Sequence, residues 1–185
     1  SGVAGMLAIA DARHRAGTKT DASIIFIAFT GEELGLRGAR HLAGKPPFDL
    51  SRVRGMFNMD MISRGEEDLI FVDGGKNADG LRDALRRSND SHKIGLRIRF
   101  DEHPDWLMRS DQGPFLFRKV PAVLLSVEDH PDYHQVSDEV DKILPKLAER
   151  VARLVLLAGV DVANHKAPAT QPATEPATQR ALPVR

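Results

Sequence analysis

The 185-residue sequence contains no cysteine. Disulfide bonds, thiolate nucleophiles and sulfur-ligated zinc are therefore excluded, and a metal site would have to be built from histidine, aspartate and glutamate. The sequence also lacks a run of about 18 apolar residues, so it predicts no membrane-spanning helix. Its 26 basic and 26 acidic residues cancel, and without a basic stripe the chain lacks the electrostatic signature of nucleic-acid binding.

With 42% hydrophobic residues, the chain has enough apolar surface for one globular domain with an ordinary core. The first residue, Ser1, is not methionine, and a helical pattern begins at once with no signal sequence before it. We therefore interpret the chain as a fragment cut inside a larger domain. Residues 163–185 repeat a Pro-Ala-Thr unit with almost no large apolar side chain, which predicts a disordered tail after a domain at 1–162.

Strands and helices are expected to alternate along the domain. Residues 23–30 (SIIFIAFT) are β-branched and aromatic without polar alternation, which is typical of a central strand buried on both faces. In the first helix, one face carries Val3, Met6, Leu7 and Ala10. The alternation predicts a three-layer α/β/α sandwich with a mostly parallel or mixed sheet. The remaining strands are predicted at 53–62, 68–74, 95–102 and 121–128, and the helices at 1–16, 33–43, 77–90 and 145–159.

Charged and imidazole side chains follow three of the predicted strands. Glu32 and Glu33 come after the first strand, and Asp60 ends the second. The segment EDHPDYHQVSDEVD, residues 128–141, follows the fifth strand and contains His134. In α/β sheets the functional groups lie in loops at the carboxyl ends of the strands. We therefore expect these side chains to meet in one cleft.

Two of these carboxylate sites also have a structural interpretation. The segment TGEE from Thr30 to Glu33 fits a capping box, in which both side chains satisfy free amides at the start of a helix. Asp60 lies between methionines at the end of an apolar strand, where a carboxylate without a partner is costly. An ion pair with Arg64 would supply that partner.

The last loop has structural alternatives as well. His134 alone fits an ordinary surface turn, and Asp138 and Asp141 precede the final helix, whose dipole they would complement. Taken together, however, carboxylate and imidazole ligands without sulfur form the donor set of catalytic zinc or a similar divalent ion. One member of the Glu32–Glu33 pair can then bind a metal while its neighbour accepts a proton from water.

Four segments carry a resemblance to a known family. FTGEELGLRGARHLA, FNMDMISR, RSDQGPFLFRKVPAVLLS and HPDYHQVSDEVDKI occur in the order and approximate spacing of peptidase family M28, the zinc aminopeptidases. The resemblance covers roughly residues 1–160. It implies a phosphorylase/hydrolase-like α/β/α domain, incomplete at its N-terminus, with two zinc ions. It further implies hydrolysis of the first bond of a peptide with a free N-terminus and, as for many relatives, a secreted or periplasmic location.

The resemblance also implies a role for each matching residue. Glu32 corresponds to the general base of the family, and Glu33 to a ligand of one zinc. Asp60 corresponds to a ligand of the other zinc, and His134 joins Glu33 at the first. Tyr133 corresponds to a tyrosine that hydrogen-bonds the oxyanion, with packing in the turn as the alternative.

The sequence departs from the family in two respects. An upstream histidine and a bridging aspartate, both metal ligands in the family, have no counterpart among the 185 residues. We therefore expect this fragment by itself to lack peptidase activity and to bind zinc poorly. Gln112 stands where the family commonly has histidine, and glutamine cannot titrate near neutral pH. We therefore expect substrate contacts or their pH dependence to differ, with the zinc ligands unaffected.

Other functions on the same scaffold stay open. A carboxypeptidase-type or glutaminyl-cyclase-like enzyme would share the fold and the metal site. A non-catalytic binding domain is a third possibility, although such a domain gains nothing obvious from an acidic cluster. Trp106, Leu107, Met108 and Phe115 would either line a substrate pocket or pack in the core. No feature of the sequence indicates an oligomeric state.

Overall fold

The computed structural model describes residues 1–165 of the chain, and these contain a mixed four-stranded sheet. The strand order is β1-β4-β2-β3; β1 pairs with β4 and β2 with β3 in parallel, whereas β2 and β4 are antiparallel. The mixed sheet predicted from the sequence is thus confirmed. The strands are β1 (Met56–Met59), β2 (Leu69–Gly74), β3 (Arg97–Phe100) and β4 (Ala122–Ser126).

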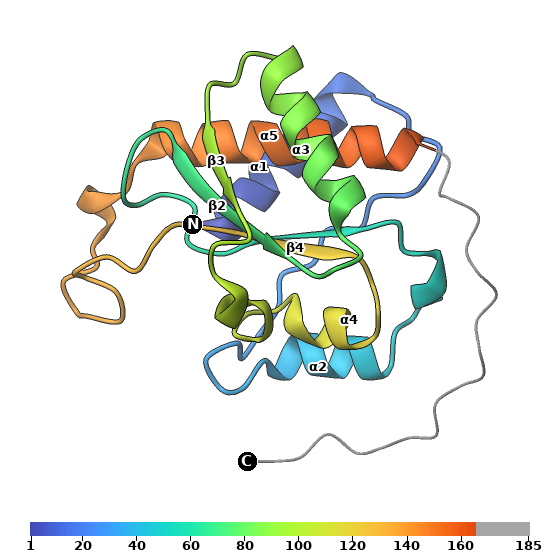
Figure 1. Cartoon of the computed structure of the whole chain (residues 1–185), viewed down its shortest axis with the longest axis horizontal. Helices are drawn as coiled ribbons and strands as arrows, with labels where there is room; N and C mark the ends of the chain where they lie inside the picture. The colour runs from blue at the N-terminus through green and yellow to red at the C-terminus, as the bar shows by residue number, and fades with distance from the viewer. Residues whose placement is uncertain (166–185) are drawn as a thin grey trace.

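Helices cover both faces of the sheet (Figure 1), which confirms the three-layer α/β/α prediction. One face carries α1 (Gly2–Ala16), α3 (Asp79–Ser91) and α5 (Pro145–Asn164). The other face carries α2 (Arg37–Gly44), α4 (Gly113–Phe117) and the 3₁₀ segment η2 (Pro104–Met108), and the remaining 3₁₀ turns are η1 (Leu50–Arg52) and η3 (Val140–Lys142). Within residues 1–165, none of the helices has the length and apolar character needed to cross a membrane.

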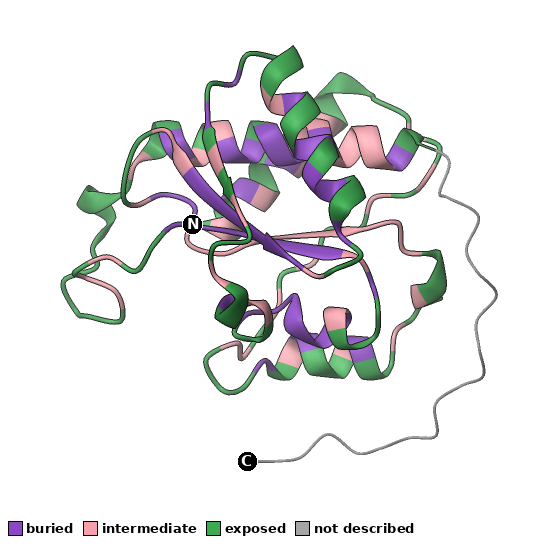
Figure 2. Ribbon diagram, in the orientation of Figure 1, coloured by how far each residue is buried: buried purple, intermediate pink, exposed green. Residues whose placement is uncertain are grey.

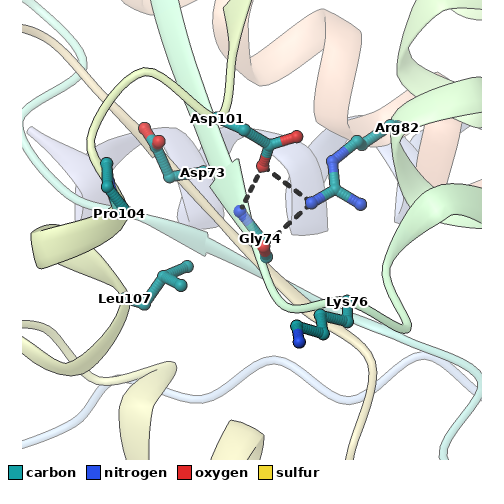
Figure 3. Close-up of a pocket in the computed structure, with 7 residues that line it drawn as sticks. All are labelled: Asp73, Gly74, Lys76, Arg82, Asp101, Pro104 and Leu107. Carbon is teal, nitrogen blue, oxygen red and sulfur yellow. Dashed lines mark hydrogen bonds and ion pairs between the residues drawn. The ribbon is translucent and has the colours of Figure 1, made fainter.

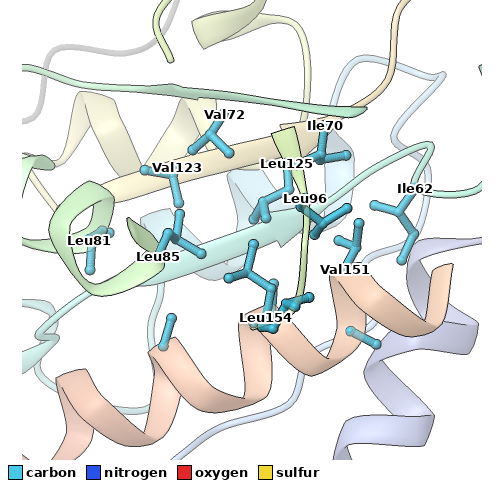
Figure 4. Packing of buried hydrophobic residues seen from close by; sticks show 14 of the residues in the cluster. Ile62, Ile70, Val72, Leu81, Leu85, Leu96, Val123, Leu125, Val151 and Leu154 are labelled. Carbon is cyan, nitrogen blue, oxygen red and sulfur yellow. The ribbon is translucent and has the colours of Figure 1, made fainter. Parts of the chain in front are cut away.

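The larger core lies between the sheet and the α1, α3 and α5 layer, where the buried side chains gather (Figures 2 and 4). Helix α5 buries Leu147, Val151 and Leu154, a spacing of three to four residues that keeps one stripe against the sheet. Helix α3 adds Leu81 and Leu85 in the same way. Each such side chain contributes about 1.5–3 kcal/mol of burial free energy. This core holds the strand ends that carry the polar residues.

Residues 23–30, predicted as a central strand, form no strand. Ile25 and Phe26 are exposed, and no described strand pairs with this segment. Strand propensity reports how well side chains fit a pleated, packed surface and does not supply the partner strand itself. The prediction was therefore wrong for the described chain, although the segment still leads directly into the turn that carries Glu32.

Helix α1 also turns a different face inward than its pattern predicted. Val3 and Leu7 are exposed, and the buried positions are Gly5 and Ile9. A Cβ atom on Gly5 would come within 2.9 Å of the Cδ1 atom of Ile62. The helix therefore packs closely through its small residue, and close approach outweighs the burial of two larger side chains.

The other differences concern the boundaries of elements. Helix α5 runs to Asn164, two residues into the segment 163–185 that was predicted to be disordered; residues 166–185 lie outside the described residues. Helix α4 was not predicted, although Pro114 in its first turn is a known start signal. Helix α2 begins at Arg37 and not at residue 33, which changes the interpretation of the glutamate pair.

Candidate functional site

The turn after Thr30 places Glu32 and Glu33 before helix α2 and not at its first residue. The Leu36 amide donates to the Glu32 carbonyl oxygen at 2.8 Å, and α2 begins only at Arg37. No side chain within residues 1–165 caps this helix. The capping-box alternative is therefore wrong, and neither carboxylate is engaged at a helix start.

Glu33 and His134 are brought together from distant parts of the chain. The Nε2 atom of His134 lies 3.0 Å from the Oε1 atom of Glu33. The His134 ring also stacks on Tyr133, with ring centroids 3.9 Å apart. His134 has a φ of 56°, a left-handed conformation uncommon outside glycine. It does lie in an exposed turn, but this turn directs the imidazole onto the Glu33 carboxylate.

Asp60 follows strand β1 and is held by a serine. The Ser110 hydroxyl donates to Asp60 Oδ2 at 2.7 Å and accepts a hydrogen bond from Asn58 Nδ2 at 2.9 Å. Arg64 pairs with Asp132 and not with Asp60. The predicted Asp60–Arg64 alternative is therefore wrong, and the carboxylate is oriented by a neutral donor.

Arg64 instead binds the loop that carries His134. Its guanidinium contacts Asp132 and, at 3.2 Å, Asp138. Asp138 therefore serves as an ion-pair partner of Arg64, in place of the helix-dipole role considered from the sequence. Lys142, Ser137 and Arg64 together hold the pKa of Asp132 well below its ordinary range. The ion pair is thus charged at neutral pH.

Four carboxylates form an acidic cluster, namely those of Glu32, Glu33, Asp60 and Asp111. Burial raises the pKa of Glu32, and the nearby charges of Glu33, Asp60 and Asp111 raise it further, against a smaller opposing effect of His134. Neighbouring like charges favour protonation of one member of the cluster. A bound cation would reverse this by stabilising the ionised forms. The cluster therefore has the electrostatic character of a cation site.

Asp111 was missed by the sequence analysis. It is only 9% exposed, and its Oδ1 atom is buried with no hydrogen-bond partner in the part of the chain that the structure describes. Burial, and secondarily the Asp60 carboxylate, raise the pKa of Asp111 to about 6. Its position in the motif RSDQGPF was the available signal, since that segment supports the family resemblance.

Gln112 is fully buried, so its side chain does not reach the surface of the described structure, and an altered pH dependence of substrate contacts stays a prediction. Its Nε2 atom donates to the carbonyl oxygens of Trp106 at 2.9 Å and Leu107 at 3.1 Å, and its Oε1 accepts from Asn58. Glutamine fits here because both ends of its amide find partners. The residue connects η2 to the strand that ends at Asp60.

Tyr133 lies half-buried against the acidic cluster. Burial raises the pKa of its phenol, and Asp129, Glu33 and Asp60 raise it further, while Arg109 opposes them. The ring packs edge to face on His130, with centroids 6.4 Å apart. The phenol is therefore kept neutral at physiological pH and can donate a hydrogen bond.

The apolar residues near η2 divide between the core and the surface. Trp106 and Phe115 are buried, whereas Met108 is exposed. For Trp106 and Phe115, core packing is therefore their role in the described structure. Met108 is free to contact other molecules at the surface.

A cavity of about 230 Å³ is lined by none of the residues of the acidic cluster; Figure 3 shows its lining. Within it the Arg82 guanidinium donates to the Gly74 carbonyl oxygen at 2.8 Å and to Asp101 at 2.7 Å. The Arg82 guanidinium is therefore engaged by groups of the protein itself, and we assign it a structural role. It is lined by Asp73, Gly74, Lys76, Arg82, Asp101, Pro104 and Leu107.

The sequence matches the model of peptidase family M28 over residues 1–159. The chain belongs to peptidase family M28. Solved structures of aminopeptidases share its fold. The zinc aminopeptidase BSAP from Bacillus subtilis aligns with a TM-score of 0.73 and 26% identity over 89% of this chain and 41% of that chain. An aminopeptidase from Aneurinibacillus sp. strain AM-1 aligns with a TM-score of 0.71 and 27% identity over 96% and 42%.

LapA from Legionella pneumophila aligns with a TM-score of 0.76 and 19% identity over 89% of this chain and 47% of that chain, a likeness that shows the fold alone. This M28 chain thus spans less than half the length of each of these three structures. No protein with a curated description matches it significantly.

Family M28 implies zinc, and the described residues fit this metal in donor type. Glu33 and His134 offer a carboxylate oxygen and an imidazole nitrogen at close range, and Asp60 lies in the same cluster. Carboxylate oxygens and imidazole nitrogens are both ordinary zinc ligands. Within residues 1–165, however, no three histidine, aspartate or glutamate side chains are close enough together to hold a metal ion. The described part of this M28 chain therefore shows no complete metal site.

Proposed function

We propose that the chain is the C-terminal part of the catalytic domain of a zinc-dependent aminopeptidase. Such an enzyme hydrolyses the first bond of a peptide that has a free N-terminus. The observation that carries the proposal is the 3.0 Å contact between Glu33 and His134 beside the acidic cluster. Membership of family M28 and the likeness to two aminopeptidase structures support it.

Each site residue has a defined role in this proposal. Glu33 and His134 would hold one zinc ion and Asp60 a second in the complete domain. Bound zinc would polarise the scissile carbonyl and lower the pKa of the attacking water. Glu32 accepts the proton of this water and passes it to the departing amine. The phenol of Tyr133 donates a hydrogen bond to the oxyanion as its charge develops.

The environment of Glu32 suits a general base. A base works best when its pKa is close to the working pH. Burial raises the pKa of Glu32, and in the metal-free chain three nearby carboxylates raise it further. Bound zinc would offset the effect of the carboxylates, whereas the effect of burial would remain. Its neighbour Glu33 is more exposed and contacts His134. The adjacent glutamates therefore have different environments, and this explains how two identical side chains can divide base and ligand roles.

In this proposal Glu33, His134 and Asp60 are only part of the ligand set, so we expect the 185-residue chain alone to show no peptidase turnover. A chelator-sensitive turnover by this chain with two zinc ions per molecule would contradict that expectation.

Three substrates distinguish the possible reactions on this scaffold. We would incubate the complete gene product, with and without a chelator, with an aminoacyl anilide, an amino-blocked peptide and a peptide with N-terminal glutamine. The aminopeptidase proposal predicts chelator-sensitive hydrolysis of the anilide and no reaction of the blocked peptide. Cleavage of the blocked peptide from its carboxyl end, or cyclisation of the glutamine, would refute it. Loss of all three reactions would favour a binding domain.

A further inference from the structure

The loop at residues 128–143 carries Tyr133 and His134 and is attached at both ends to one short segment. Before the loop, the Val127 amide donates to the Met61 carbonyl oxygen at 3.0 Å. After it, the Leu144 amide donates to the Ser63 carbonyl oxygen at 2.7 Å. The segment that directly follows Asp60 thus fixes both ends of the loop.

Arg64 continues this segment and contacts the middle of the loop. Its Nη2 atom donates to Asp132 Oδ2 at 2.5 Å and lies 3.1 Å from His130 Nδ1. Its Nη1 atom lies 3.2 Å from Asp138 Oδ1, a charge contact without an aligned hydrogen bond. The side chain is 11% exposed. One nearly buried guanidinium therefore joins three positions along the loop.

Little else attaches the 128–143 loop to the rest of the domain. Val136 and Val140 are 101% and 78% exposed, so the apolar side chains of the loop do not anchor it. Within residues 1–165, its other side-chain hydrogen bonds and ion pairs to the rest of the chain are those of Glu128 with His103 and of His134 with Glu33. Ser137 and Lys142 bind Asp132 within the loop, but they do not attach it to the domain. The position of the loop relative to the domain therefore depends mainly on Arg64.

A continuous series of contacts leads from Arg64 to the glutamate pair. His130, which Arg64 contacts, packs edge to face on Tyr133. Tyr133 stacks on His134, which contacts Glu33. We infer that Arg64 is a positioning residue that holds the 128–143 loop so that Tyr133 and His134 face Glu33. The purpose of that arrangement rests on the proposed function; the arrangement itself does not.

The sequence offers a specific probe, because the chain contains a single tyrosine and a single tryptophan. In the 185-residue chain grown with fluorotyrosine, one ¹⁹F resonance reports on Tyr133. In Arg64→Met we expect this resonance to move most of the way to its position in the urea-denatured chain. The indole proton of Trp106, in a separate cluster with Phe71, should stay in place. Local release of a loop without global unfolding has this signature.

Two further variants separate positioning from general stability. Arg64→Lys keeps the charge but cannot reach three partners, so it should restore the Tyr133 resonance only in part. Asp138→Asn removes one exposed partner and should shift the resonance in the same direction by less. Arg15→Met, which removes an isolated surface pair with Asp11 on α1, is the matched control and should change neither signal.

The inference is overturned if Arg64→Met and Asp138→Asn both leave the Tyr133 resonance unchanged. It is also overturned if Arg64→Met shifts the Trp106 signal as much as that of Tyr133, because Arg64 would then support the whole domain. If Arg64→Met does not fold, Asp138→Asn decides alone. None of these signals requires turnover, so a failed peptidase assay would reject the proposed function and leave this inference standing.

Discussion

Asp111 is the group whose charge should cost the domain the most stability. It is buried beside Asp60, and its pKa is raised to about 6 from an ordinary value of 3.8. Because the folded pKa lies above the unfolded one, folding favours the protonated carboxyl. The stability that this preference contributes is complete below about pH 4 and is lost as the pH rises through about 6. This increase of about 2 in the pKa of Asp111 corresponds to about 3 kcal/mol of folding free energy.

Replacing Asp111 with asparagine removes the charge and keeps the shape. In the metal-free chain we expect Asp111→Asn to raise the free energy of unfolding by about 2–3 kcal/mol at about pH 8. At about pH 4, where the native carboxyl is protonated, the gain should fall below about 0.5 kcal/mol. Urea unfolding of both chains at the two pH values, with a chelator present, measures the difference.

The matched control is Asp90→Asn on helix α3, which makes the same chemical change at an exposed position. It should change stability by less than about 0.5 kcal/mol at either pH. Equal stabilisation by Asp111→Asn at both pH values would show that charge is not the cause. A loss of stability at about pH 8 would show that Asp111 has a partner in solution.

Three other substitutions test the packing that supports the site. Leu154→Ala should lower the free energy of unfolding by about 2–5 kcal/mol, because its side chain is fully buried; Leu157→Ala, half-buried on the same helix, should cost less. Gln112→Leu should cost about 1–3 kcal/mol, since it removes the side-chain donor to the Leu107 carbonyl oxygen and one of the two acceptors of the Asn58 amide. Arg82→Met should cost about 1–3 kcal/mol, because it removes a donor from the buried Gly74 carbonyl oxygen, against less than about 1 kcal/mol for the exposed Arg86→Met. Urea unfolding at neutral pH checks all of these values, and a near-neutral result for Leu154, Gln112 or Arg82 would contradict its assigned role.

Much of the fold was predictable because its elements carry local signals. Helices α3 and α5 repeat their apolar residues every three to four positions, and strands β2 and β4 are short apolar runs between turns. The segment 23–30 carries an equally strong signal and forms no strand, because pairing requires a neighbour that no local pattern describes. For helix α1 the predicted buried face was wrong for a different reason. Gly5 makes close packing possible, and a count of apolar residues does not detect this.

The site was predictable in part for a similar reason. The approach of Glu33 and His134 was predicted from the rule that polar residues after strands gather at the edge of an α/β sheet. The two side chains do meet, although residues 23–30, which precede Glu33, form no strand. The burial of Asp111 and the attachment of the last loop to Arg64 depend on distances that form only in three dimensions. Carboxylates such as Asp132 and Asp138 look like surface residues in sequence, and their partner becomes evident only in the fold.

The most direct test of the account is the activity of Glu32→Gln in the complete gene product. Hydrolysis of an aminoacyl anilide and zinc content per molecule would be measured together, with Glu33→Gln as the matched variant one residue away. The proposed function predicts that Glu32→Gln lowers kcat by about 10²–10⁴-fold with its zinc content unchanged, whereas Glu33→Gln lowers both. Full activity of Glu32→Gln, or a loss of zinc equal to that of Glu33→Gln, would contradict it.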